Sequence, residues 1–305
     1  MIASFFQPFV RMFKNRSIVG LFFVLPAFLV VILLLIYPII ITIFYSFTSK
    51  SLIFPNYENI GLENYISILT DIEFLKSFWV SIKWTFFSIV FQVIIGFTAA
   101  LALNRIPKLQ GMYRTFLIIP WAFPVIVIAL SWQWILDDVN GFIPNLLTNL
   151  GITSGNVALF SDPSFAFWTI VFINVWFEFP LIMVNVLAAL QTIPKEQIEA
   201  ARIDGASIFQ TFWYITLRRV RVVVGILIVL RTIWVFNNFE MVYLLTGGGP
   251  AGSTTTLPIF AYKTGWDLQQ LGMASAVTLL LVIFLLIISL LYFKLLNKWQ
   301  KRDEV

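Results

Sequence analysis

The sequence MASAVTLLLVIFLLIISLLYF occupies residues 273–293 and carries no charged side chain. A helix of this length measures about 30 Å, which matches the hydrocarbon core of a bilayer. Five earlier stretches of similar length are also predominantly apolar, at about residues 19–45, 78–103, 113–136, 165–190 and 220–239. The first is too long for a signal peptide and has no small-residue cleavage site after it, so we expect it to remain as a span. The pattern predicts an all-α integral membrane protein with six transmembrane helices.

The composition agrees with a membrane protein. Of the 305 residues, 60% are hydrophobic and only 11% are charged, against about 25% charged in ordinary soluble domains. The mean hydropathy is +0.91. The chain has no cysteine and no histidine, which excludes disulfides, thiolate nucleophiles, Cys/His zinc sites and Ser-His catalysis. No metal site is expected.

The distribution of basic residues predicts the orientation. Fifteen of the 20 Lys and Arg residues fall in the two tails and in the connections after the second and fourth spans. Basic residues concentrate on the cytoplasmic side of membrane proteins, so both termini are expected in the cytoplasm. We therefore divide the chain into an amino-terminal tail (1–17), a first helix with its outer loop (18–76), a core of spans two to six (77–295) and a carboxyl-terminal tail (296–305). The fifteen residues are Arg11, Lys14, Arg16, Arg105, Lys108, Arg114, Lys195, Arg202, Arg218, Arg219, Arg221, Lys294, Lys298, Lys301 and Arg302.

The cytoplasmic connection at residues 192–219 has the features of a helical hairpin. Pro194 suits the first position of a helix, and Glu196 suits its positive end. Gly205 is expected to end this helix, and Ser207 can cap a second one. The second helix carries an apolar stripe of Ile208, Phe209, Phe212 and Ile215. From these residues alone, docking against a partner and lying on lipid headgroups remain equally supported.

The same connection resembles a known signature. Glu199-Ala200-Ala201 is followed after three residues by Gly205, and after nine more by Ile215-Thr216-Leu217. This is similar to the coupling loop of the permease subunits of binding-protein-dependent ABC importers (EAA, three residues, G, nine residues, I-x-L-P). One position departs from it, because Arg218 stands where the signature has proline.

Further stretches resemble the carbohydrate-uptake branch of that family, and the likeness runs from about residue 18 to residue 295. The stretch at 246–250, Thr-Gly-Gly-Gly-Pro, is similar to the larger maltose-type permease and to the glycerol-phosphate-type A permease. The other matching stretches are Gly61-Leu62-Glu63-Asn64-Tyr65, Pro120-Trp121, Asn174-Val175-Trp176 and Phe236-Asn237-Asn238-Phe239-Glu240.

The resemblance implies a type I importer fold and one half of a heterodimeric sugar permease in a prokaryotic plasma (inner) membrane. The implied partners are a second homologous permease, two cytoplasmic ATPase subunits and an extracytoplasmic solute-binding protein. The chain has no G-x-x-x-x-G-K-[ST] motif, so we expect no bound cofactor, with ATP and Mg²⁺ held by the ATPase subunits and no enzymatic activity here. The residues implied for ATPase coupling are Glu199, Ala200, Ala201, Asp204 and Gly205. Those considered for contact with the binding protein are Gly247, Gly248, Gly249 and Pro250, although a tight turn with positive φ is the favoured interpretation of these glycines.

Polar residues inside the spans suggest a substrate pathway, because such residues are costly in lipid. Asn174, Glu178 and Asn185 share one face of the fourth span at 100° per residue. Amides and carboxylates bond sugar hydroxyls, and aromatic rings stack on sugar faces. The alternative is structural: a Glu178–Arg231 ion pair, with amides joining the helices. The pathway candidates are Asn174, Glu178, Arg231, Trp234, Asn237 and Asn238.

Three other functions can be weighed against sugar import. The same architecture could carry a non-sugar solute such as glycerol-3-phosphate, but a phosphate favours several cavity cations and only Arg231 is evident. An integral-membrane enzyme would need a second acidic cluster beside Asp137-Asp138 to bind Mg²⁺, and none is visible. An ion-coupled transporter would follow a proton or sodium gradient and need no ATPase.

Overall fold

The computed structural model describes residues 16–153, 155 and 157–303. In these residues the regular structure is helical, apart from one isolated bridge between Thr48 and Asn59. The tail residues Arg11 and Lys14 lie outside the described part. The chain divides into two compact units, a smaller one with residues up to Ser67 and Thr264–Leu279, and a larger one with Ile68–Lys263 and Leu280 onward.

The smaller unit begins with a long apolar helix. Within it, Phe23–Ser46 has a mean hydropathy of 3.0, and none of its apolar window is buried. Asn64 fixes the end of this helix by donating to the backbone oxygens of Ser46 and Thr48, at 2.9 Å each. The elements of this unit are α2 (Arg16–Val31), the π-helical segment η1 (Ile32–Ile36), α3 (Tyr37–Ser46), most of α4 (Glu63–Thr70), the end of α14 (Leu257–Trp266) and the start of α15 (Leu271–Asp303).

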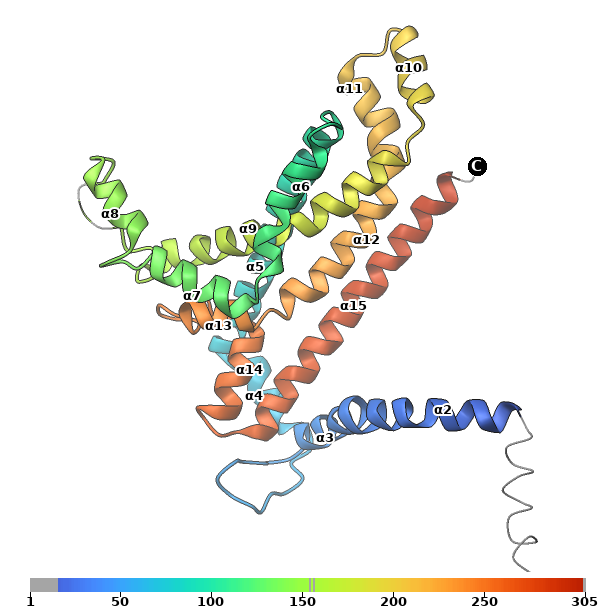
Figure 1. Cartoon of the computed structure of the whole chain (residues 1–305). Helices are drawn as coiled ribbons and strands as arrows, with labels where there is room; N and C mark the ends of the chain where they lie inside the picture. Colours follow the sequence, from blue (N-terminus) through green and yellow to red (C-terminus); the bar gives the residue numbers. More distant parts are fainter. Residues whose placement is uncertain (1–15, 154, 156, 304–305) are drawn as a thin grey trace, which may run out of the picture. The chain divides into compact units, whose positions relative to one another are not determined.

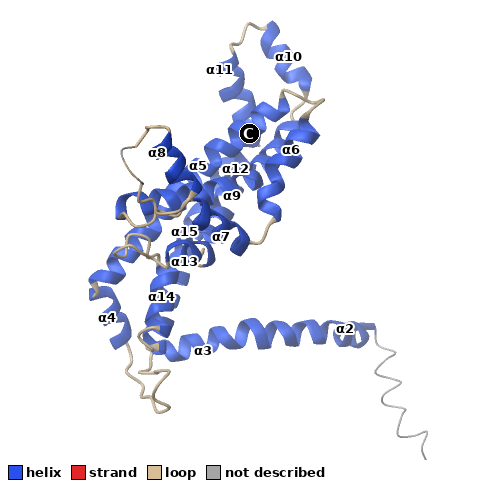
Figure 2. Ribbon diagram, turned by 60° about the vertical axis from the view of Figure 1, so that its left-hand side comes forward, coloured by secondary structure: helices blue, strands red, loops and turns tan. Residues whose placement is uncertain are grey.

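The larger unit contains the long helices α5 (Ile72–Asn104) and α9 (Pro163–Gln191) and the rest of α14 and α15 (Figure 1, Figure 2). Its other elements are α6 (Gln110–Ile118), η2 (Ile119–Ala122), α7 (Val125–Ile135), α8 (Phe142–Asn149), α10 (Lys195–Ile203), α11 (Ile208–Gln210), η3 (Thr211–Thr216), α12 (Leu217–Phe236) and α13 (Glu240–Thr246).

Two of the expected spans are bent helix pairs rather than single helices. The third divides into Gln110–Ala122 and Val125–Ile135, which meet at 91°. Pro120 and Pro124 lie at this break, and proline lacks the N–H that a continuous helix requires. The fifth extends into α13 through a 45° bend. The described residues therefore contain four helices long and apolar enough to cross a membrane, or up to six if each bent pair is one span.

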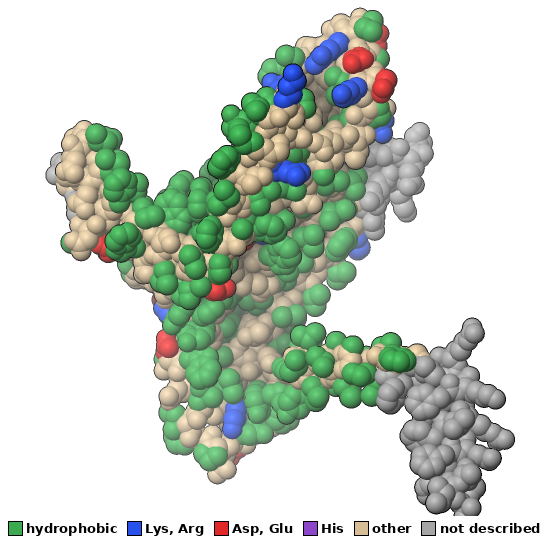
Figure 3. Space-filling model, in the orientation of Figure 1, with side chains coloured by type: hydrophobic (Ala, Val, Ile, Leu, Met, Phe, Trp, Pro, Cys, Tyr) green, Lys and Arg blue, Asp and Glu red, His purple; other side chains and the backbone are tan. Residues whose placement is uncertain are grey.

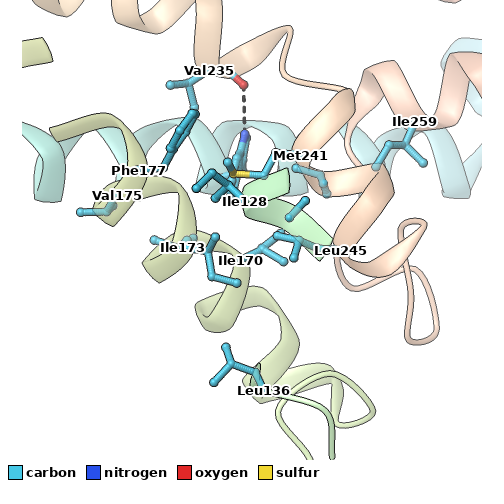
Figure 4. Packing of buried hydrophobic residues seen from close by; sticks show 14 of the residues in the cluster. Ile128, Leu136, Ile170, Ile173, Val175, Phe177, Val235, Met241, Leu245 and Ile259 are labelled. Carbon is cyan, nitrogen blue, oxygen red and sulfur yellow. Dashed lines mark hydrogen bonds between the residues drawn. The ribbon is translucent and has the colours of Figure 1, made fainter. Parts of the chain in front are cut away.

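The core of the larger unit is built on the contact between α5 and α9. Gly96 allows this contact, since a Cβ there would lie 2.9 Å from Cβ of Ile182 and 3.0 Å from the backbone oxygen of Phe179. Earlier in α5, the indole nitrogen of the fully buried Trp84 donates to the backbone oxygen of Val235 at 2.9 Å (Figure 4). Trp84 and Val235 belong to one cluster with buried apolar side chains of α7, α9 and α13 (Figure 4). The helices that carry the polar residues of the spans are thus held in fixed register.

Candidate functional site

A buried polar cluster joins α5, α9 and α12 in the larger unit. Arg231 of α12 is only 2% exposed. Its Nη1 donates to Oε2 of Glu178 at 3.0 Å, and its Nε donates to Oε1 of Gln92 at 3.0 Å. The guanidinium is therefore held from two sides, by a carboxylate of α9 and by an amide of α5.

Gln92 and Asn174 complete this cluster. The side-chain nitrogen of Gln92 donates to Oδ1 of Asn174 at 2.8 Å, and Asn174 in turn donates to the sulfur of Met241 at 3.6 Å. Both amides are fully buried. A buried amide without partners is costly, so these bonds fix the positions of three helices.

Gln92 is not among the residues predicted for the pathway, although the sequence carries a signal for it. Its face of α5 repeats small polar residues at helical spacing, at Ser77, Ser81, Thr85 and Ser88, and all of them are buried. A polar face at i, i+4, i+8 and i+11 within an apolar span indicates contact with protein rather than with lipid. Extending this face by one turn reaches Gln92.

The structure brings some of the candidate pathway residues together and not others. Trp234 lies beside the cluster, with its ring centroid 5.8 Å from Cζ of Arg231, and is 56% exposed. Glu178 keeps 15% of its side chain accessible. The remaining asparagines bond locally: Asn237 donates to the backbone oxygen of Ile233, and Asn238 accepts from the backbone N–H of Met241. Asn185, which shared the predicted face, donates to Leu181 of its own helix.

The second candidate site is the hairpin at residues 192–219, which projects from one end of the larger unit (Figure 1, Figure 2). Gly205 ends α10 with a positive φ of 80°. Ser207 and Gln210 then form a reciprocal capping box, in which the Gln210 N–H donates to Oγ of Ser207 and the Ser207 N–H donates to Oε1 of Gln210. Pro194 is the residue before the first helical position of α10. Local chemistry therefore determines this turn, as the sequence predicts.

The tip of the hairpin is exposed and both charged and apolar. Charged side chains gather there in Figure 3, while much of the visible surface below is hydrophobic. Of the expected coupling residues, Glu199, Ala200, Asp204 and Gly205 are exposed, and Ala201 is half-buried. Three large apolar side chains at the turn are more than three-quarters exposed, namely Ile203 (86%), Ile208 (76%) and Phe209 (77%).

The base of the hairpin is anchored in the helical core. Ile198 of α10 and Ile215 of η3 pack against the cluster of buried residues shared by α5, α9 and α12. Arg219 donates to Oε1 of Gln197 at 3.1 Å and so connects α12 to α10. Phe212 packs edge to face on Phe97 of α5, with centroids 5.8 Å apart. Of the apolar stripe predicted for the second helix, Ile208 and Phe209 are therefore exposed, and Phe212 and Ile215 are packed against the core.

The glycine-rich segment after α13 forms a tight, hydrogen-bonded loop. Gly247 and Gly248 adopt φ values of 58° and 89°. A Cβ on Gly248 would lie 2.7 Å from Oγ1 of Thr255, whose hydroxyl donates to the Gly248 oxygen at 2.8 Å. Thr254 donates to the Gly249 oxygen at 2.7 Å. These contacts explain the conformational need for glycine here.

The acidic pair Asp137-Asp138 caps loop backbone. Asp138 accepts N–H bonds from Phe160 and Ser161 at 2.9 and 2.8 Å, and Asp137 accepts from Asn140 at 2.7 Å. Across the described residues, no three Asp or Glu side chains are grouped so as to hold a metal ion.

Comparison with known proteins identifies the family of this chain. The profile of the family described as "Binding-protein-dependent transport system inner membrane component" matches residues 92–302, which is more than two-thirds of the chain. The chain belongs to this family. It is therefore an ABC transporter permease subunit of an inner membrane, a transport subunit rather than an enzyme.

Individual relatives of this family align with the chain over most of their length. The trehalose/maltose transport system permease protein MalF of Thermococcus litoralis is 34% identical over 275 residues, or 90% of this chain and 92% of the relative. The sulfoquinovosyl glycerol transport system permease protein SmoG of Agrobacterium fabrum is 30% identical over 274 residues, or 89% and 88%. A chain of a bacterial ABC transporter involved in the import of the acidic polysaccharide alginate has the same fold, with a TM-score of 0.82 at 20% identity over 94% of this chain and 99% of that one.

Proposed function

We propose that this permease subunit imports a sugar or oligosaccharide, driven by ATP hydrolysis on separate subunits that dock on the hairpin at residues 192–219. The observation that carries the proposal is the physical continuity between the exposed hairpin and the polar cluster. Both are built on α9 and α12, and Ile198 and the Arg219–Gln197 bond join α10 to these helices. A force applied to the hairpin reaches the helices that hold Glu178 and Arg231.

In this mechanism the hairpin acts as a lever. Exposed Ile208 and Phe209 and the carboxylates of Glu199 and Asp204 provide an apolar centre and charges for a groove on the ATPase. Ala200, Ala201 and Gly205 add little bulk, so the helix can approach closely. Closure of two ATPase subunits on ATP would then move both permeases between inward-open and outward-open states.

The orientation we propose has six spans and cytoplasmic termini, each bent helix pair counting as one span. The concentration of Lys and Arg in the tails and in the two connections supports it. It places the hairpin in the cytoplasm and the loop at Gly247–Pro250 on the outer side, where we propose that this loop contacts the solute-binding protein. The proposed domain division remains 1–17, 18–76, 77–295 and 296–305.

The proposed substrate class follows from the relatives and from the chemistry of the cluster. MalF and SmoG carry sugar-transport names. The accessible edge of Glu178 can accept bonds from hydroxyls, and the exposed ring of Trp234 offers a face for a sugar ring. Exposed Asn237 adds an amide one turn further along. Asn174 and Arg231 are buried behind these groups and support them, while Asn238 caps α13.

The same geometry disfavours a phosphate-bearing cargo. The Arg231 guanidinium already bonds a carboxylate and an amide, and it is nearly inaccessible. An anionic substrate would have to displace Glu178 from it at the cost of a buried ion pair. A neutral sugar requires no such exchange.

Purification from a mild detergent followed by mass spectrometry tests the assembly. We expect a second, homologous membrane subunit and an ATPase pair to copurify with the chain, together with ATPase activity that a sugar-loaded binding protein stimulates. Uptake that follows a proton or sodium gradient and proceeds without an ATPase would contradict the proposal.

A Trp234→Ala variant tests the proposed pathway. Loss of a stacking face should reduce stimulated transport by roughly tenfold. Trp134→Ala is the matched control, because Trp134 is 81% exposed on α7 and lines a hollow with Asn140 and Phe142 rather than with residues of the polar cluster. Equal activities of the two variants would remove Trp234 from the pathway.

A further inference from the structure

A hollow with a basic and aromatic lining lies where α12 begins. Its volume is about 420 Å³, and it lies between η3, α12 and α15. Arg218 and Arg221 line it together with three amphipathic rings. None of its nine lining residues carries a carboxylate; they are Trp213, Tyr214, Leu217, Arg218, Arg221, Val224, Gly225, Ile228 and Tyr292.

A second hollow continues along the same helix and is apolar. It has a volume of about 590 Å³ between α5, α12 and α15, and its lining includes Phe236, Phe284 and Ile288. Ile228 lines both hollows, so the two lie end to end. From Arg221 to Phe236, α12 rises about 22 Å, which is more than the depth of one leaflet of the hydrocarbon core. We call the two hollows together the α12 groove.

We propose that the α12 groove binds an anionic phospholipid, with its phosphate at Arg218 and Arg221 and one acyl chain lying along Val224, Ile228 and Phe236. The proposal rests on the orientation given above, which sets the basic end of the groove at the cytoplasmic surface. Basic pockets between transmembrane helices on that side suit anionic headgroups.

The chemistry of the groove matches this occupant from end to end. Trp213, Tyr214 and Tyr292 are the ring types that sit at headgroup level in membrane proteins. Below them the lining is almost wholly aliphatic and aromatic, as an acyl chain requires. The basic end of the groove therefore favours an anionic lipid over a neutral one. The apolar part of the groove favours a lipid over free phosphate, which has no acyl chain.

Arg218 is the one position of the hairpin at which this chain departs from the coupling-loop signature, which has proline there. An adjacent arginine provides a matched control, since Arg219 bonds Gln197 and does not line the α12 groove. Replacing Arg219 by glutamine removes the same charge from the same turn of the helix. A difference in lipid binding between the variants at Arg218 and Arg219 then comes from the groove and not from the change in net charge.

The test is native mass spectrometry of the full transporter in detergent, titrated with dioleoyl phosphatidylglycerol or dioleoyl phosphatidylcholine. We expect the wild type to retain phosphatidylglycerol selectively. Each arginine near an anionic headgroup is worth roughly fivefold in affinity, so Arg218→Gln with Arg221→Gln should weaken retention about 25-fold. Arg219→Gln should retain the lipid as the wild type does.

A second variant tests the apolar part of the groove while the arginines stay in place. Ile228→Trp fills the junction of the two hollows and should weaken retention by at least tenfold. Unchanged retention in both the arginine variant and Ile228→Trp would overturn the proposal, as would equal retention of the two lipids.

A cysteine introduced at Ile228 identifies the occupant directly, because the chain has no other cysteine. A thiol-linked photocrosslinker there should capture phospholipid, and capture of a helix from a second membrane protein would overturn the proposal. Lipid retention is read without transport, so a failure here is distinguishable from an error in the proposed cargo.

Discussion

Replacement of Glu178 by glutamine should destabilise the chain more than replacement of its partner, Arg231. The two charged groups lie 3.0 Å apart between Nη1 of Arg231 and Oε2 of Glu178. At an effective dielectric constant of 20, such a contact contributes about 5 kcal/mol before desolvation is counted. Removing one member of a buried pair typically costs about 3–5 kcal/mol, because a buried charge remains uncompensated.

The unequal burial of the pair predicts an asymmetry. Glu178→Gln leaves a guanidinium that is 2% exposed and whose charge is no longer paired, although Nε still donates to Gln92, so the full cost of about 3–5 kcal/mol applies. Arg231→Gln leaves a carboxylate that retains 15% of its exposure, so we expect a smaller loss of about 1–3 kcal/mol. The double variant places two glutamines at these positions. Its loss of unfolding free energy should be smaller than the sum of the losses of the two single variants.

The assay is a double-mutant cycle on the unfolding free energy, measured by denaturant titration of the purified protein in one fixed detergent. An interaction energy of about 2 kcal/mol or more, with Glu178→Gln the weaker protein, is the expected outcome. Two single variants that each lose less than about 0.5 kcal/mol would refute the reasoning, since that result describes a solvated pair.

Three further substitutions test other parts of the account. Gly96→Leu should force α5 and α9 apart at Ile182 and lower the unfolding free energy by at least about 2 kcal/mol, measured in the same assay. Ser207→Ala removes one half of the capping box with Gln210 and should cost about 1 kcal/mol, together with a measurable loss of ATPase stimulation; full stimulation would separate the cap from coupling. Gly248→Ala should weaken the loop after α13, seen as faster hydrogen exchange of its amides, because that residue has a φ of 89°.

The hairpin could be predicted closely from the sequence because its chemistry is local. Pro194, Gly205 and Ser207 act on backbone within a few residues of themselves, so their roles do not depend on the rest of the fold. The long apolar runs likewise predicted where the apolar helices lie. Pro120 and Pro124 lie at the break in the third span, but the 91° angle between its two halves depends on packing that a sequence does not contain.

The polar cluster was only partly predictable. Helical spacing places Asn174 and Glu178 on one face, yet it does not say that the amide of Gln92 from another helix lies between Asn174 and Arg231. Asn238 has a local bond that helical spacing does not predict. A short amide can satisfy nearby backbone, and its bond to the Met241 N–H serves the start of α13.

The central claim is that ATPase action reaches this subunit through the hairpin at residues 192–219. A single cysteine at Ala201 in this cysteine-free chain, crosslinked in membranes with and without ATP, tests it most directly. The account predicts capture of an ATPase subunit from the cytoplasmic side, with a yield that changes with nucleotide. Modification of that cysteine by a membrane-impermeant reagent added outside intact cells would contradict it.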